Sequence, residues 1–294
     1  MAVLDQLPSG ARVVVLRLRS LGDCVLTTPA LQILKRARPD LRVAVMVEDR
    51  FRAIFERNPD IDAIKPPSLQ SLRAEKPDLC LNLHGGTRSA WMTAASGARY
   101  RAGFGHFRHR FVYNLRIPRA QQIVNVERKV HTAEHLASAI FWLGAPRVEI
   151  PRAKLVCAKT VKPEPIAVIH PVAATSQKTW PAAGFVAVAE HLRVQGIEPV
   201  FIGAPADDLR PFGAYRIQAG SLSELKSLLA SASLFIGNDS GPAHMAAAFG
   251  LPVVAIFSDS DPDIWAPWRT QSEVLIRPST ENVLAALARL RVPA

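Results

Sequence analysis

The first turn in this chain that has the form of a ligand-binding loop contains a carboxylate. The stretch RLRSLGDCVLTTPAL (residues 17–31) follows an apolar run ending at Leu16 and leads into a helical pattern. Such a strand-to-helix turn in an α/β protein normally carries glycines that let a pyrophosphate approach. Here Gly22 is followed by Asp23, which repels phosphate but is able to take a proton from a hydroxyl. A carboxylate at this place does not suit a phosphate site, whereas Asp23 does fit the N-cap of the predicted helix.

A later turn has the chemistry of an anion site. The stretch NDSGPAH (residues 238–244) places Ser240 and Gly241 at the start of a predicted helix, with His244 in its first turn. Backbone N–H groups and the partial positive charge of a helix N-terminus favour a phosphate there. An ordinary turn capped by Asp239 or Ser240 fits the same residues.

A second loop in the same half of the chain strengthens the phosphate interpretation. The stretch PVAATSQKTWP (residues 171–181) supplies the hydroxyls of Thr175 and Ser176 and one cation, Lys178, before a predicted helix. Two such loops fit a diphosphate better than either does alone. A solvated surface lysine remains the alternative for Lys178.

Two series of strands alternating with helices position these turns. This alternation predicts parallel sheets with helices on both faces, and ligands then bind at the carboxyl ends of the strands. The fold expected is α/β, with two Rossmann-like doubly wound domains, 1–158 and 159–294, facing a cleft. Residues 145–165 are interpreted as a closing strand followed by a linker. Strands are predicted at 12–18, 42–48, 62–64, 78–84, 100–104, 165–170, 197–203, 233–238, 251–258 and 273–276, and helices at 25–38, 50–57, 69–75, 87–98, 131–143, after 181, and at 221–232, 242–249 and 281–290.

Charge is distributed unevenly between the two halves. Residues 1–150 carry 23 Lys/Arg against 13 Asp/Glu, a net charge of +10, while residues 151–294 carry 13 against 12, a net charge of +1. No acidic residue occurs from 79 to 126, a window with seven arginines, among them Arg88 and Arg101. Such a field attracts a polyanion, and the preference for arginine favours recognition of phosphate or carboxylate. A solvated basic surface is the simpler alternative.

Several classes of protein are disfavoured. No apolar run is long enough to span a membrane, no signal peptide is evident, and no nucleotide motif of the Walker or full GxGxxG type occurs. The three cysteines are far apart, which favours a reducing compartment, and Cys80 fits the core. His131 and His135 lie four residues apart but lack the HExxH motif of a metalloenzyme, and they are expected to cap or pack a helix.

Four segments together resemble the bacterial lipopolysaccharide heptosyltransferase family, glycosyltransferase family 9. They are RLRSLGDCVLTTPAL, DLCLNLHGGTRSA, HPVAATSQKTWP and LFIGNDSGPAHMAAAFGLPVVAIFSDSDPDIWAPW, and they span nearly the whole chain. The resemblance implies a GT-B fold and an inverting, metal-independent transfer without a cofactor. The donor it implies is a nucleotide-diphosphate sugar, typically ADP-heptose, held by the second domain. The implied acceptor is an anionic lipopolysaccharide core, met by the first domain of a cytoplasmic enzyme in peripheral contact with the inner membrane.

The resemblance also implies roles for individual residues. Asp23 matches the catalytic base, Lys178 a lysine near the donor phosphates, and Asp239 an aspartate that holds donor hydroxyls. Acceptor binding is assigned to Arg88 and Arg101 from the acid-free window. The remaining donor-binding residues are expected to be Thr175, Ser176, Ser240, Gly241 and His244.

The sequence departs from the family pattern at one place, and two alternative functions stay open. Ala204, Pro205 and Ala206 stand where the family commonly has an acid for the ribose, so Asp207 and Asp208 come late. The same architecture would suit a nucleotide-sugar epimerase, which would need no acceptor. A non-enzymatic glycan- or nucleic-acid-binding module, with stacking by Phe104, Phe107 and Phe111, is the third reading, although no nucleic-acid partner is expected. The last helix is expected to dock at the domain junction.

Overall fold

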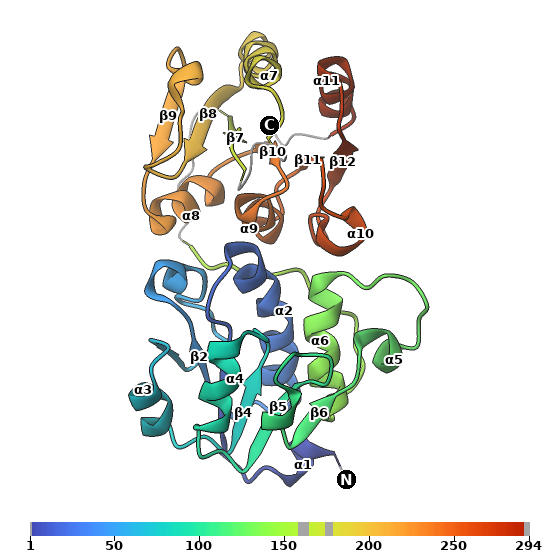
Figure 1. The fold of residues 1–294 in the computed structure, drawn as a ribbon. Helices are drawn as coiled ribbons and strands as arrows, with labels where there is room; N and C mark the ends of the chain where they lie inside the picture. The colour runs from blue at the N-terminus through green and yellow to red at the C-terminus, as the bar shows by residue number, and fades with distance from the viewer. Residues whose placement is uncertain (1, 158–164, 174–178, 291–294) are drawn as a thin grey trace. The chain divides into compact units, whose positions relative to one another are not determined.

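The chain forms two compact α/β units, Met1–Pro151 and Arg152–Ala294. They are seen in a computed structural model that describes residues 2–157, 165–173 and 179–290 (Figure 1). Each unit is built on a six-stranded sheet whose paired strands all run parallel. The expected fold class, two Rossmann-like units, is confirmed.

The first unit has the strand order β3-β2-β1-β4-β5-β6. The order reverses between β1 and β4, which are neighbours, so the carboxyl ends of these two strands are the expected ligand site. Its elements are α1 (Val3–Gln6), β1 (Arg12–Leu16), α2 (Leu21–Ala37), β2 (Arg42–Met46), η1 (Asp49–Ile54), β3 (Ala63–Lys65), α3 (Leu69–Ala74), β4 (Leu79–Asn82), α4 (Thr87–Ala94), β5 (Tyr100–Phe104), η2 (Arg110–Val112), β6 (Leu115–Ile117), α5 (Ala120–Val124) and α6 (Thr132–Leu143).

The second unit repeats this order as β12-β11-β10-β7-β8-β9, with the reversal between β7 and β10. Its elements are β7 (Ile166–His170), α7 (Ala182–Val194), β8 (Glu198–Gly203), η4 (Arg210–Phe212), β9 (Arg216–Ala219), α8 (Leu222–Ala230), β10 (Leu234–Asn238), α9 (Gly241–Phe249), β11 (Val253–Phe257), α10 (Pro262–Trp265), β12 (Ser272–Ile276) and α11 (Thr280–Arg289).

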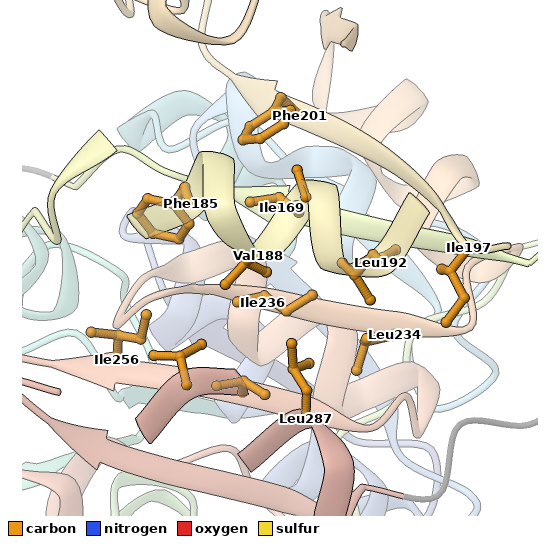
Figure 2. Packing of buried hydrophobic residues seen from close by; sticks show 14 of the residues in the cluster. Ile169, Phe185, Val188, Leu192, Ile197, Phe201, Leu234, Ile236, Ile256 and Leu287 are labelled. Carbon is orange, nitrogen blue, oxygen red and sulfur yellow. The ribbon is translucent and has the colours of Figure 1, made fainter. Parts of the chain in front are cut away.

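The central strands are buried on both faces because helices cover each side of the two sheets. All four residues of β4 and all five of β10 are buried, as expected of central parallel strands covered by helices. In the first unit α2 packs beside α6 (Figure 1). In the second, Phe185, Val188 and Leu192 of α7 lie over Ile169 and neighbouring strand residues, and α11 covers the adjoining part of the same core (Figure 2). Each domain thus has its own hydrophobic core.

The start of α2 corrects one sequence prediction. The helix begins at Leu21 and not at residue 25, so Asp23 lies in its first turn and is not the N-cap. Ser20 takes the N-cap position with φ of 73°, in the left-handed region that non-glycine residues seldom occupy. Strain of this kind tends to be kept at functional sites.

The end of the first unit differs from the prediction as well. Residues 145–157 contain no strand, so the expected closing strand there is wrong. The sheet is completed by β6, which the sequence analysis did not predict. The expected boundary at 158/159 falls where residues 158–164 lie outside the described part of the chain. In the second unit α11 packs against α7 and β12.

Candidate functional site

The carboxyl end of β1 holds a buried cation paired with the candidate base. The Nη1 atom of Arg17 lies 3.3 Å from Oδ1 of Asp23, and the Arg17 side chain is 5% exposed against 24% for Asp23. Arg17 also donates from Nη2 to the carbonyl of Leu83, the residue after β4. Burial lowers the pKa of Arg17, and the Asp23 carboxylate opposes that shift. One guanidinium therefore joins the segments after β1 and β4 and fixes the Asp23 carboxylate, which stays partly open to solvent.

Other titratable groups surround this pair. Burial and the cations of Arg17 and Arg19 lower the pKa of His84 to about 4, so its imidazole is neutral at pH 7. Glu48, which follows β2, lies 3.8 Å from Nη1 of Arg88, and Arg88 donates from Nη2 to the Pro67 carbonyl at 2.6 Å. The carboxyl edge of this sheet thus combines a fixed carboxylate with neutral and cationic donors.

The structure separates the two arginines expected to bind the acceptor. Arg88 lies in the first turn of α4 at the carboxyl edge, and its side chain is 60% exposed. Arg101 lies in the amino-terminal half of β5, where Nε and Nη1 donate to the Val112 and Ala98 carbonyls at 3.2 and 3.4 Å. The fold does not bring Arg101 to this edge, and only Arg88 is carried forward as an acceptor contact.

The second unit has a cavity at its own reversal point. Its volume is about 310 Å³. Gly241 and Pro242 line it, so the positive end of α9 borders the space, where an anion is favoured. It is lined by His170, Val172, Ala173, Asp207, Asp239, Ser240, Gly241 and Pro242.

The polar groups of this cavity are organised around Ser240. Ser240 is the N-cap residue of α9, yet in the described structure its side chain makes no capping bond. Its Oγ lies instead 3.0 Å from Nδ1 of His170, at the end of β7. Burial lowers the pKa of His170 to about 4, so this imidazole is neutral at pH 7. The cavity wall therefore presents hydrogen-bonding groups without a fixed cation among its described lining residues.

The expected donor residues fall into two groups. Asp239, Ser240 and Gly241 line the cavity, while His244 is buried one turn into α9, with its ring centroid 6.3 Å from that of Trp265. The other three lie outside the described residues: Thr175, Ser176 and Lys178.

A buried asparagine ends the fourth strand of each unit and holds the adjoining loops. Asn238 accepts from the Trp180 N–H and donates to the Pro171 carbonyl, both at 2.9 Å, so it ties both ends of the 171–180 loop to β10. Asn82 accepts from the N–H groups of His84 and Gly85, both at 3.0 Å. Both asparagines are fully buried. Asn238 thus holds the loop after the neighbouring strand β7, and Asn82 holds the loop that follows its own strand β4.

Comparison with known proteins identifies the family. The family model "Glycosyltransferase family 9 (heptosyltransferase)" matches residues 68–285. The chain belongs to glycosyltransferase family 9. It is similar to a lipopolysaccharide heptosyltransferase 3 of Escherichia coli, with 29% identity over 84% of this chain and 83% of that protein. A lipopolysaccharide heptosyltransferase 1 of Pseudomonas aeruginosa shows 24% identity over 85% and 79%.

Solved structures support the fold of this family 9 glycosyltransferase. A family 9 glycosyl transferase of Veillonella parvula superimposes with a TM-score of 0.82 at 22% identity, covering 97% of this chain and 91% of the other. The ADP-heptose lipopolysaccharide heptosyltransferase II of E. coli gives 0.80 at 19% identity, over 94% and 97%. The family assignment favours a glycosyltransferase over the epimerase and the non-enzymatic module. Phe104, moreover, is fully buried and unable to stack on a base.

Sequence reasoning missed four residues of this family 9 site. Arg17 and Asn82 were not singled out in the first unit, nor Asn238 in the second. Arg17 and Asn238 bind groups far along the chain, whereas Asn82 holds the N–H groups of the two nearby residues His84 and Gly85. Asp207 was noted only as arriving late for the ribose. It lines the cavity and accepts from the Ala204 N–H at 2.6 Å. For Arg17, Asn82 and Asn238 the available signal was a polar residue at or directly after the carboxyl end of a buried strand.

Proposed function

We propose that this family 9 glycosyltransferase transfers a heptose from ADP-heptose to a lipopolysaccharide core, with donor in the second unit and acceptor at the first. The observation that carries the proposal is the cavity at the start of α9. It combines the positive end of a helix with Asp239 and Ser240, groups suited to phosphate and to sugar hydroxyls. Related structures support the choice of donor, since E. coli WaaC has been solved with ADP and with ADP-2-deoxy-2-fluoro heptose.

The chemistry proposed for the first unit is proton removal by Asp23. As the acceptor oxygen attacks the anomeric carbon, its proton passes to the Asp23 carboxylate, and the bond from the anomeric carbon to the diphosphate breaks. ADP leaves with the bonding electrons, and the anomeric centre inverts. Arg17 holds the carboxylate in place through the 3.3 Å ion pair.

Protein groups are proposed to carry the charge of the leaving diphosphate, without a metal or cofactor. The start of α9 and Lys178 would stabilise that charge, and a preorganised dipole is well suited to the task. Among the described residues no cluster of three or more His, Cys, Asp or Glu side chains could hold a metal ion.

The acceptor proposed is an anionic glycolipid, with Arg88 as one contact. The net charge of +10 on residues 1–150 supports an anionic partner for this half of the chain. The enzyme is proposed to work in the cytoplasm, in peripheral contact with the inner membrane. Within the described residues no helix is both long and apolar enough to cross a bilayer.

A donor panel tests the proposal. ADP-heptose, UDP-glucose and GDP-mannose are each added to the full chain, and Tm is measured. ADP-heptose alone is expected to raise Tm, and transfer to heptose-deficient lipopolysaccharide is then followed by release of ADP. Equal stabilisation by the three donors would reject the ADP-sugar assignment. Conversion of ADP-heptose to another sugar nucleotide without acceptor would instead establish an epimerase.

A further inference from the structure

Two aromatic side chains of the first unit lie together on its surface. Trp91 of α4 is 54% exposed and Phe111 of η2 is 63% exposed. Their ring centroids are 6.0 Å apart in an edge-on arrangement, and the His109 ring lies 6.2 Å from Trp91 and 6.0 Å from Phe111. These three residues form what we call the aromatic patch. Among the large hydrophobic side chains exposed on the described residues, Trp91 and Phe111 are the two aromatic ones. Adjacent exposed rings of this size mark an interaction surface.

The aromatic patch is held rigidly. The opposite face of α4 is buried, and η2 is anchored by Val112 and Tyr113, which are 7% and 2% exposed. Tyr113 receives a hydrogen bond from Nδ2 of Asn82 at 2.9 Å, which ties η2 to the end of β4. His109 Nε2 lies 3.0 Å from the Thr87 hydroxyl in the first turn of α4. One side of the aromatic patch therefore lies at the carboxyl edge of the sheet, where Asp23 also lies.

Positive charge flanks the patch. Arg108 and Arg110 stand on either side of His109 in the sequence, and both are exposed. In the described part of the chain neither forms an ion pair with a carboxylate, whereas Arg88 is already engaged with Glu48. Residues 79–126 contain no acidic side chain at all. The partner must therefore be anionic and must also accept two aromatic rings.

We propose that the aromatic patch, with Arg108 and Arg110, docks this enzyme on an anionic lipid bilayer. Tryptophan and phenylalanine bury their rings at the boundary between headgroups and acyl chains, while arginines bind the negatively charged headgroups. The choice of a bilayer rests on the proposed function, because a glycolipid acceptor lies in such a surface. Docking then presents the carboxyl edge of the first sheet to the lipid headgroups.

Vesicle co-sedimentation of the full chain tests this proposal. The wild type is expected to bind vesicles of phosphatidylglycerol mixed with phosphatidylethanolamine and not vesicles of phosphatidylcholine. Trp91→Ser with Phe111→Ser should weaken binding at least about ten-fold, since two aromatic contacts are lost. Arg108→Gln and Arg110→Gln should each weaken it about five-fold and reduce its salt dependence.

A matched control removes exposed apolar side chains elsewhere. Val194 and Ile276 of the second unit are 88% and 64% exposed, and Val194→Ser with Ile276→Ser should leave vesicle binding unchanged. The docking proposal is overturned if the Trp91/Phe111 variant binds as the wild type does. Binding of the wild type to RNA but not to vesicles also overturns it.

Release of ADP with a delipidated core oligosaccharide is measured in parallel. If the wild type binds vesicles but releases no ADP with this acceptor, the proposed function is rejected while the docking proposal is retained.

Discussion

Replacing Asn238 should loosen the donor site without touching a group that we place against the donor. Asn238→Ala removes the acceptor of the Trp180 N–H and the donor to the Pro171 carbonyl, each at 2.9 Å. Trp180 and Pro171 are both buried, so water cannot readily replace Asn238 as the partner of the Trp180 N–H or the Pro171 carbonyl. Leaving two buried polar groups without partners costs about 2–4 kcal/mol of unfolding free energy. For a unit of this size, Tm should fall by roughly 6–12 °C.

The same variant should weaken ADP binding. Pro171 and Trp180 lose their ties to β10, and Val172 and Ala173 beside Pro171 line the cavity. The ligand must then fix these positions at a cost of about 1–2 kcal/mol, close to a ten-fold rise in Kd. Calorimetric titration with ADP measures that Kd, and scanning calorimetry measures Tm.

Asn82→Ala is the matched control, because Asn82 occupies the corresponding position in the first unit. It should destabilise that unit, through loss of its bonds to the N–H groups of His84 and Gly85. The ADP Kd should stay unchanged, while the transfer rate falls. Equal weakening of ADP binding by both variants would refute the division of donor and acceptor between units. An unchanged Tm for Asn238→Ala would refute the role given to the asparagine.

Two further predictions concern backbone space and protonation. Gly85 has φ of +77°, and a Cβ there would lie 2.6 Å from the Phe107 ring, whereas Gly97, with φ of +73°, has nothing within 4 Å. Gly85→Ala should therefore lower the free energy of unfolding, measured by urea denaturation, by at least about 1 kcal/mol more than Gly97→Ala does. Equal losses would show that the Phe107 ring moves aside for the new methyl group. The pKa of His170 is lowered to about 4, against 6.5 when unfolded, so the unfolded chain binds the proton first and stability is lost as pH falls from about 6.5 towards 4. His170→Gln should flatten that part of the stability–pH curve, and a His170 NMR titration midpoint near 6.5 would contradict the burial argument.

The sequence predicted features whose signals lie within a few residues of one another. β5 was predicted with its observed bounds, and Ser221 and Glu224 form the expected capping box of α8. Gly144 ends α6 and Gly250 ends α9, both with positive φ. His131 caps α6 through Nδ1, and Cys80 is fully buried, as expected. Local signals of this kind act within a few residues, which is why sequence alone conveys them.

Two of the four edge strands, and the long-range polar contacts, escaped prediction for a physical reason. β6 and β9 lie at the edges of their sheets, and β9 (RIQA) is largely exposed, so neither carries a marked apolar run. The Asp23 assignment could be proposed from the family motif, but its ion pair with Arg17 depends on how the turn after β1 folds. The clamp made by Asn238 joins Pro171 and Trp180 to β10, a contact that only the tertiary fold brings about.

A single-turnover measurement on Asp23→Asn tests the central claim most directly. The substitution keeps the size of the side chain and removes its ability to take a proton. With ADP-heptose and lipopolysaccharide core, we predict a transfer rate lower by at least about one hundred-fold, as expected for loss of a general base, with the ADP-heptose Kd within about two-fold of the wild type. A transfer rate within a few-fold of the wild type would contradict the assignment of Asp23 as the base.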